Sequence, residues 1–325
     1  MITPCVQSVR LGGDLWFKLE LCQPTGSYKD RFAEREIERI VTTGARMIVS
    51  ASSGNTGAAL AACCAREGIG CLVIVPADEA AGKVAQMRAH GAYVVRVPRF
   101  TKDAAVTETV MGALRTYCDE RGVPLVVSAF KYCPHGMEGV SRIADELAAM
   151  DPKQVFVPVG GGGLYSAVAR GFAMAKLAVR VHAVQSAGCG TVVDGWGAGE
   201  RQSRPASGVT RVSGLSVPMD IDATLALGWL HFNGGQGIAV TDDEIYSAQR
   251  RLLREEGVYC EPAGAAALAG WLRGVADKRI DPAERAVCLV TGSGGKDPES
   301  LEAAAALVDS PLVEAGDLGG WLRDE

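Results

Sequence analysis

The chain has 325 residues, 48% of them hydrophobic, which is enough to bury a large core and predicts two lobes rather than one. A formal net charge of −5, a pI near 5.6 and the lack of a Lys/Arg-rich tract argue against nucleic acid as a partner. No apolar run reaches the roughly 18 residues that span a bilayer. The N-terminal stretch lacks the basic start and apolar run of a signal peptide, so we expect a cytoplasmic protein with no membrane partner.

The ten cysteines and four histidines are scattered along the chain, and the sequence contains no C-x-x-C pair. This distribution argues against a disulfide framework and against a zinc site. We therefore predict reduced thiols, several of them packed as small apolar residues, and no metal.

Short apolar runs alternate with amphipathic stretches along the chain. Runs rich in β-branched residues predict strands covered on both faces at 47–52, 71–76, 93–98, 125–130, 155–160, 179–186 and 287–292. The stretches between them predict helices at 31–43, 55–67, 80–90, 101–121, 138–150, 164–176, 242–256, 262–274 and 298–308. This alternation predicts an α/β fold of open, mostly parallel sheets flanked by helices. Residues 187–240 are Gly-rich and irregular, which is compatible with either a lid or an interface.

Three loops follow predicted strands where open α/β sheets bind ligands, at the carboxyl ends of strands near helix N-termini. They are S-S-G-N-T-G after 47–52, G-G-G-G after 155–160 and T-G-S-G-G-K-D after 287–292.

The glycine loop predicts a phosphate site, because missing side chains let several backbone N–H groups converge on one anion at a helix N-terminus. The loop does not match the P-loop pattern G-x-x-x-x-G-K-[ST]. It also does not match the dinucleotide-binding pattern G-x-G-x-x-G, because Ser166 stands where the last glycine would fall. A close-packed strand–helix turn is the alternative, but four successive glycines are costly for a turn alone.

The polar loop 52–57 offers more side chains than a helix N-cap needs, because Ser52, Ser53, Asn55 and Thr56 all stand at one junction. The excess suggests a second anion site, suited to a carboxylate. At the third loop Thr291 supplies a strand-end hydroxyl that can both donate and accept.

Lys29 lies in C-Q-P-T-G-S-Y-K-D-R (22–31), just before a predicted helix. The simplest interpretation of any single lysine is a solvated charge. A lysine near a phosphate cradle, a carboxylate loop and a strand-end hydroxyl would also suit a Schiff base with a phosphate-bearing aldehyde cofactor. Burial lowers the pKa of such an amine and makes it available as a nucleophile.

Four motifs, in this order, resemble those of the fold-type II (tryptophan synthase β-like) family of pyridoxal-phosphate enzymes. They are P-T-G-S-Y-K-D-R (24–31), S-S-G-N-T-G (52–57), V-G-G-G-G (159–163) and T-G-S-G-G-K-D-P (291–298). The E-G-V-Y-C-E-P-A-G segment also resembles a family segment near the active site. K-D-R after the lysine and the last motif are most similar to threonine synthase and its relatives.

The resemblance implies two domains with the active site between them, and a homodimer. Residues 1–34 and 132–325 would form the larger domain that binds pyridoxal 5′-phosphate. Residues 35–131 would form a smaller α/β domain carrying the S-S-G-N-T-G loop.

The resemblance also implies a role for each motif residue. Lys29 would bind the cofactor covalently and then move the α-proton of the substrate. Asn55 would hydrogen-bond the 3′-oxygen of the cofactor, and Thr291 would meet its pyridine nitrogen. The substrate carboxylate would be held by Ser52, Ser53 and Thr56, and the 5′-phosphate by Gly160, Gly161, Gly162 and Gly163.

A neutral hydroxyl at the ring nitrogen favours prompt loss of a leaving group over a long-lived carbanion. The resemblance thus implies a lyase or synthase for β- or γ-elimination or replacement on a small L-amino acid, with threonine synthase (O-phosphohomoserine to threonine) as the template. A threonine/serine dehydratase-type ammonia-lyase and a β-replacement enzyme such as cysteate or cysteine synthase remain alternatives. A non-catalytic small-molecule binder is a more remote alternative.

Two departures weaken the threonine synthase assignment. Gly136 stands where threonine synthases usually have an arginine for the substrate phosphate, and Gly162 where they often have asparagine. Lys131, His135 or Arg142 could replace that arginine.

Overall fold

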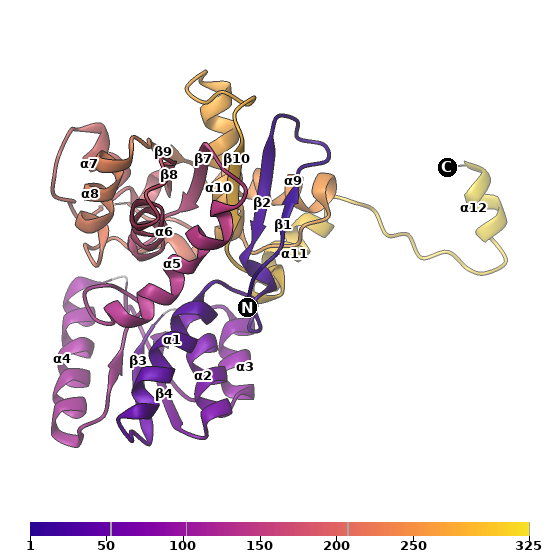
Figure 1. The fold of residues 1–325 in the computed structure, drawn as a ribbon. Coiled ribbons are helices and arrows are strands. Elements are labelled where there is room, and N and C mark those ends of the chain that lie inside the picture. The colour runs from indigo at the N-terminus through magenta and orange to yellow at the C-terminus, as the bar shows by residue number, and fades with distance from the viewer. Residues whose placement is uncertain (53, 102, 207, 325) are drawn as a thin grey trace.

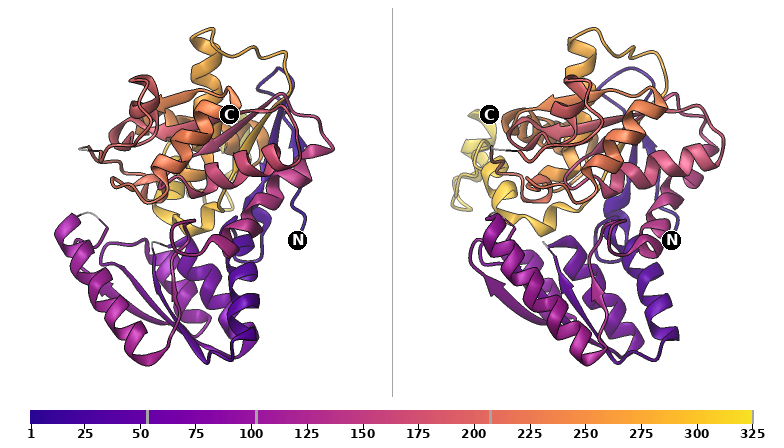
Figure 2. Two further views of the ribbon diagram at one scale, coloured as in Figure 1. Left: turned by 60° about the vertical axis from the view of Figure 1, so that its left-hand side comes forward. Right: turned by 90° about the vertical axis from the view of Figure 1, so that its left-hand side faces the viewer.

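The computed structural model describes residues 1–52, 54–101, 103–206 and 208–324, and the strands in these ranges form two sheets in two lobes (Figures 1 and 2). The larger sheet has the order β1-β2-β10-β7-β8-β9 and the smaller has the order β5-β4-β3-β6. The strands are β1 (Cys5–Gln7), β2 (Leu15–Leu19), β3 (Met47–Ala51), β4 (Gly70–Pro76), β5 (Tyr93–Val97), β6 (Leu125–Val126), β7 (Gln154–Pro158), β8 (Arg180–Ser186), β9 (Gly237–Val240) and β10 (Ala286–Val290). All neighbours pair in parallel except β1 with β2, which confirms the predicted mostly parallel α/β architecture.

Helices cover the sheets, as the alternating sequence pattern predicts. They are α1 (Lys29–Thr42), α2 (Asn55–Glu67), α3 (Ala81–Ala89), α4 (Ala104–Arg121), α5 (Pro134–Ala148), α6 (Gly163–Met174), α7 (Val193–Gly197), α8 (Ala223–Asn233), α9 (Asp242–Glu256), α10 (Pro262–Ala276), α11 (Pro298–Ala305) and α12 (Leu318–Asp324). The last of these ends an arm that extends away from both lobes (Figure 1).

Helices α1 and α5 join the two lobes through one apolar core. Phe32 and Ile37 of α1 and Val140 of α5 are fully buried in a cluster that reaches strands of both sheets. The helices approach closely because α5 presents glycines to α1. A Cβ on Gly139 would lie 2.2 Å from the carbonyl oxygen of Arg31. The predicted domain limits stay a prediction, and the first of them, between residues 34 and 35, falls inside α1.

The predicted strand 125–130 is wrong beyond its first two residues. β6 ends at Val126, and the chain then turns, with the N–H of Ala129 donating to the carbonyl of Val127. The tightness of this turn frees Ser128 from the sheet.

The region 187–240, expected to be irregular, contains α7, α8 and β9. The sequence of α8, A-T-L-A-L-G-W-L-H-F-N, carries apolar residues around most of its circumference, so it shows no amphipathic stripe that would have revealed a helix. β1 and β2 were not predicted, because strands of three and five residues are too short to show a clear periodicity.

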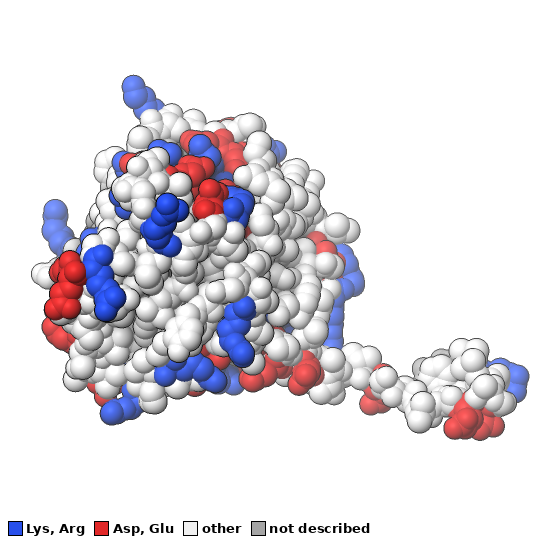
Figure 3. Space-filling view, turned by 90° about the horizontal axis from the view of Figure 1, so that it is seen from below, with Lys and Arg blue, Asp and Glu red and all other residues white. Residues whose placement is uncertain are grey.

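The surface charges, the cysteines and the helices can be compared with the expectations about nucleic acid, disulfides, membranes and metals. On the face drawn in Figure 3, acidic and basic side chains of the described residues are interspersed rather than gathered into one basic patch. All ten cysteines are free, and eight are buried, as expected for small apolar side chains. In the described part of the chain, no helix has the length and apolarity to cross a membrane. Nor do His, Cys, Asp and Glu there gather in threes that could hold a metal ion.

Candidate active site

A cavity of about 500 Å³ opens where strands of both sheets end, and residues of both lobes line it. The structure brings nearly all the predicted site residues together on it: Lys29, Ser52, Asn55, Thr56, Gly160, Gly161, Gly162, Gly163 and Thr291. Ser53, also predicted, lies outside the described residues.

Lys29 is the first residue of α1 and is half-buried on the cavity. Its Nζ donates a hydrogen bond to Oγ of Ser128, 2.9 Å away, at the turn after β6. The N–H of Tyr28 donates to the carbonyl of Thr291 at 3.1 Å, so the backbone itself holds the lysine beside the end of β10. Ser128 was not predicted, because it was assigned to the interior of a strand.

The turn before Lys29 is fixed by Asp30. Its carboxylate accepts hydrogen bonds from the N–H and the Oγ of Thr25, at 2.9 and 2.8 Å. Gly26 adopts a left-handed φ of 82°, which the turn requires. Burial raises the pKa of Asp30, and the bonds to Thr25 oppose that rise. The turn thus directs the start of α1 at the cavity.

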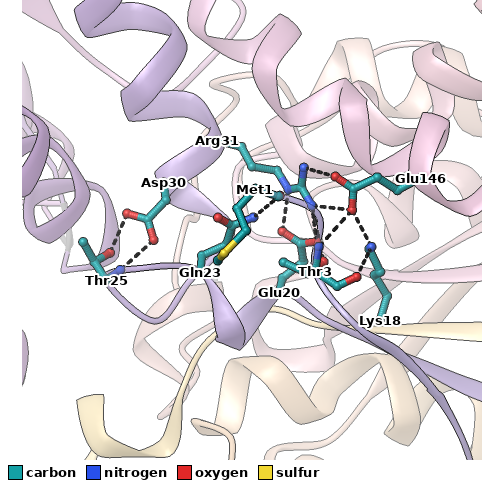
Figure 4. Close-up of polar contacts among 9 residues, drawn as sticks. All are labelled: Met1, Thr3, Lys18, Glu20, Gln23, Thr25, Asp30, Arg31 and Glu146. Atoms are coloured by element: carbon teal, nitrogen blue, oxygen red, sulfur yellow. Dashed lines mark hydrogen bonds and ion pairs between the residues drawn. The ribbon is translucent and has the colours of Figure 1, made fainter.

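Arg31 does not line the cavity; it anchors α1 to Glu20 and Glu146 (Figure 4). Its Nε lies 2.7 Å from Oε2 of Glu20 and its Nη1 lies 2.6 Å from Oε1 of Glu146, which also pairs with Lys18. Burial alone would lower the pKa of Arg31, but the two carboxylates raise it. We refer to Arg31, Glu20, Glu146 and Lys18 as the anchor cluster.

The glycine loop joins β7 to α6 and lies close under a later segment. A Cβ on Gly160 would lie 2.9 Å from the carbonyl oxygen of Gly214, and one on Gly162 would lie 2.5 Å from that of Asp222. Gly162 is also the N-cap of α6, with φ 96° and no side-chain cap. The first N–H groups of a 12-residue helix therefore remain available to an anion.

Asp222 is a carboxyl beside this loop that the sequence did not predict. It accepts hydrogen bonds from the N–H groups of Phe130, at 2.7 Å, and Lys131, at 3.2 Å. Burial raises the pKa of Asp222, and Lys29 is among the groups that oppose the rise. A phosphate in the glycine loop would favour the protonated form of Asp222 further.

The polar loop begins α2. Gly54, the N-cap, has φ 46°, and Thr56 is buried. Asn55 Nδ2 donates to Oε1 of Glu261 at 2.6 Å, while Asn55 Oδ1 is buried with no hydrogen-bond partner among the described residues. An orphaned polar atom at the cavity wall indicates a site built for a further polar group.

Lys83 and Glu261 complete this wall, and sequence reasoning had assigned neither a role. Lys83 Nζ lies 3.2 Å from Oε2 of Glu261 and 3.8 Å from Oε1 of Glu79. Nothing local marks Lys83, which looks like an ordinary residue in the first turn of a helix. The E-P-A-G resemblance was the only signal for Glu261. We refer to Lys83, Glu79, Glu261 and Asn55 as the cross-lobe cluster.

The position expected to carry a phosphate-binding arginine faces away from the cavity. Gly136 is buried in the α1–α5 contact, where a Cβ would lie 2.6 Å from the ring of Phe32. Of the three suggested replacements only Lys131 lines the cavity; His135 and Arg142 do not. The sequence prediction that His135 or Arg142 could fill the role therefore finds no support in this geometry.

The cavity lining carries more acids than bases among the described residues. The acids are Asp78, Glu79, Asp220, Asp222 and Glu261, and the bases are Lys29, Lys83, Lys131 and Arg211. Arg211 already pairs with Asp243, 2.6 Å away, and Lys83 pairs with two carboxylates.

These residues fit pyridoxal 5′-phosphate, the cofactor that the sequence resemblance implies. The open helix N-terminus suits its phosphate, the orphaned Asn55 amide oxygen lies at the cavity wall, and the lysine amine faces the same space. Two α/β lobes around such a cavity define the fold-type II class of enzymes.

Comparison with known proteins agrees. The family model described as "Pyridoxal-phosphate dependent enzyme" matches residues 2–292. Threonine synthase of Methanocaldococcus jannaschii is 32% identical over 296 residues, covering 88% of this chain and 72% of that protein. Threonine synthase of Mycobacterium leprae is 31% identical over 326 residues, covering 96% of this chain and 85% of that protein.

Solved structures give the same fold. A pyridoxal 5′-phosphate-dependent aspartate racemase superposes with a TM-score of 0.79 at 25% identity, covering 92% of both chains. Threonine deaminase isoform 2 from Solanum lycopersicum gives 0.80 at 22% identity, covering 95% of this chain and 89% of that one, which shows the fold alone. The chain belongs to the pyridoxal-phosphate-dependent enzyme family, and pyridoxal 5′-phosphate is its cofactor.

Proposed function

We propose that the enzyme catalyses elimination or replacement at Cβ or Cγ of a small L-amino acid. The observation that carries the proposal is the hydroxyl of Thr291 at the end of β10, on the same cavity as Lys29. Bound there, the cofactor supplies an electron sink that acidifies the α-proton of the substrate. A hydroxyl does not hold a proton on the ring nitrogen as a carboxylate would, so this lining favours leaving-group loss over transamination.

The chain's own residues divide the remaining work. The Lys29 amine takes the α-proton, and its hydrogen bond to Ser128 orients the amine. The start of α2, with Ser52 and Thr56, offers hydroxyls and N–H groups to the substrate carboxylate. The glycine loop holds the phosphate of the cofactor. Since Ser52 and Thr56 lie in the smaller lobe, the substrate is held between the lobes.

The charges of the lining favour a substrate whose leaving group is not a phosphate. Among the described lining residues, Lys131 is the one cation besides Lys29 outside an ion pair, and its Nζ lies over the ring of Tyr132. A second phosphate beside that of the cofactor would meet five carboxyl groups and no arginine clamp. Threonine or serine ammonia-lyase chemistry, or β-replacement on a serine derivative, therefore suits the geometry best.

Threonine synthase chemistry on O-phosphohomoserine is the second candidate. It is favoured by the similarity to threonine synthases over 96% of the chain. The cytoplasmic location expected from the N-terminal sequence and the homodimer implied by the family resemblance belong to the same proposal, and light scattering of the purified protein tests the dimer.

The covalent role of Lys29 is tested with Lys29→Ala. The wild-type protein should show the visible absorbance of cofactor bound covalently to Lys29. The Lys29→Ala variant should lack this absorbance after dialysis. Lys153→Met is the matched control, because Lys153 is a surface lysine paired with Asp151 at 2.7 Å. A colourless wild type that takes up no added pyridoxal phosphate would overturn the proposal and revive a non-catalytic binder.

The leaving group is tested by steady-state assays on threonine, serine, O-acetylserine and O-phosphohomoserine. Oxo-acid and ammonia formation from the hydroxy amino acids supports the first candidate. Phosphate release without ammonia supports the second candidate. In that case Lys131→Met should raise KM for O-phosphohomoserine by about 10-fold, because one lost charge-assisted hydrogen bond costs roughly 1.5 kcal/mol.

A further inference from the structure

The cross-lobe cluster spans the two lobes at the wall of the cavity. Lys83 belongs to α3 in the smaller lobe, and its side chain is only 3% exposed. Its Nζ reaches Oε2 of Glu261 at 3.2 Å and donates to Oγ of Ser213 at 3.1 Å, both in the larger lobe. A single buried ammonium thus joins α3, the start of α10 and the segment that covers the glycine loop.

Glu261 fixes the orientation of the Asn55 amide. An ionised carboxylate can only accept hydrogen bonds, so Nδ2 of Asn55 must face Oε1 of Glu261, as it does at 2.6 Å. The amide oxygen is thereby directed away from Glu261. Glu261 itself is held by its own N–H, which donates to the carbonyl of Gly292, the residue after Thr291.

The cluster contains two acids and one base, so Lys83 is the ion-pair partner of both carboxylates. Lys296, also buried, adds a positive charge near Glu261. Glu79 lies 3.8 Å from Lys83 and also raises the electrostatic cost of a second carboxylate there. Burial alone would lower the pKa of Lys83, but Glu261 and Glu79 raise it, so Lys83 stays charged. Without that ammonium, Oε2 of Glu261 loses its ion-pair partner, and the carboxylate is no longer held where Oε1 accepts from Asn55 Nδ2.

We propose that Lys83 is a positioning residue: its ion pair holds the Glu261 carboxylate in place, and Glu261 thereby sets which atom of the Asn55 amide faces the cofactor. The inference rests on the proposed function only in that pyridoxal phosphate occupies this cavity. Lys83 also packs along the polar loop, since a Cβ on Gly54 would lie 2.3 Å from its Cδ. The same side chain therefore ties the loop that begins α2 to the larger lobe.

The test is Lys83→Met, which replaces the aliphatic part of the side chain with one of similar length and removes the charge. Affinity for pyridoxal phosphate is measured by titrating the cofactor-free protein, and the absorbance of the bound cofactor is followed from pH 6 to pH 9. We expect affinity to fall about 10-fold or more, as for other residues that orient a ligand-binding side chain, with a shifted pH profile. Lys153→Met should stay within about twofold of wild type. Unchanged affinity and pH profile in Lys83→Met would overturn the proposal.

Lys83→Met can fail to fold because it removes the ion-pair partner that the buried Glu79 and Glu261 share. The double variant Lys83→Met/Glu261→Gln removes one of those charges. If the pair only stabilises the fold, the double variant recovers both Tm and cofactor affinity, which would overturn the proposal. If Lys83 positions Asn55, Tm recovers but affinity stays low, because a glutamine both donates and accepts and no longer sets the amide.

Cofactor uptake by the wild-type protein is measured first, because it distinguishes failure of the proposed function from failure of this inference. A wild-type protein without Lys29-dependent uptake of pyridoxal phosphate would remove the premise. A wild type that takes it up, with a Lys83→Met variant that binds equally well, would remove only this inference.

Discussion

The two buried charge clusters of this enzyme differ in balance and in place. The anchor cluster has two bases and two acids, lies away from the cavity and ties α1 to η1 (Glu20–Cys22) and α5 (Figure 4). The cross-lobe cluster has one base for two acids and lies on the cavity wall. A balanced cluster suits a structural anchor, whereas an unbalanced one leaves hydrogen-bonding capacity that a bound group can use.

The pKa directions follow the same division. Burial opposes ionisation of Glu146, but Arg31 and Lys18 hold its pKa below the ordinary value. Burial raises the pKa of Glu79, and Lys83 does not reverse that rise. Glu146 of the anchor cluster thus favours the folded state when charged, while Glu79 of the cross-lobe cluster costs stability when charged.

The largest expected effect comes from Arg31→Met in the anchor cluster. It removes the ion-pair partner of the buried Glu20 and leaves the partly buried Glu146 with Lys18 alone, so we expect the free energy of unfolding to fall by about 3–5 kcal/mol. Urea unfolding measures this loss. Arg35→Met is the control, because Arg35 lies on the same helix, is 41% exposed and should change stability by less than about 0.5 kcal/mol.

The cofactor affinity of Arg31→Met tests whether the anchor cluster acts on stability alone. At temperatures where the variant is folded, its affinity for pyridoxal phosphate should stay within about threefold of wild type, because Arg31 does not line the cavity. A variant with normal stability and lost affinity would reverse the roles assigned to the two clusters.

Sequence reasoning reached the parts of the site that are local in the chain. The glycine loop, the polar loop and Thr291 each follow a buried strand within a few residues, so the strand pattern alone puts each of them at the carboxyl edge of its sheet. Lys29 gained its place from the resemblance, and the structure adds that backbone pairing with the end of β10 holds it there.

The contacts that connect these loops were not predictable, because they join distant residues without a local pattern. Lys83 and Glu261 lie far apart in the sequence, and Asp222 begins a helix that has no apolar stripe. Gly136 shows the converse case. Its departure from the family pattern was visible in the sequence. Only the contact with Phe32 shows that a glycine is needed here for α5 to pack closely against α1.

A smaller effect on the free energy of unfolding is expected for Glu146 of the anchor cluster, and this effect should depend on pH. Since the folded pKa of Glu146 is lowered from 4.5, its contribution is present above the unfolded pKa and is lost as pH falls through the folded value. Glu146→Gln should therefore lower the free energy of unfolding by about 1–3 kcal/mol at pH 7 and lose that effect near pH 3. Glu138→Gln, an exposed glutamate on the same helix, is the control. An effect of equal size at both pH values would show that charge is not the cause.

The smallest effect is expected for Glu79→Gln, and its sign should be opposite. The folded pKa of Glu79 is raised from 4.5, so the folded state binds the proton more tightly and stability falls as pH rises through that pKa. Removing the carboxylate should raise the free energy of unfolding by up to about 1 kcal/mol at pH 8, with no gain at pH 4. Glu108→Gln on the exposed face of α4 should change neither value. A loss of stability at pH 8 would mean that Glu79 and Lys83 form a stabilising pair, and the cross-lobe cluster would then be an anchor like the first.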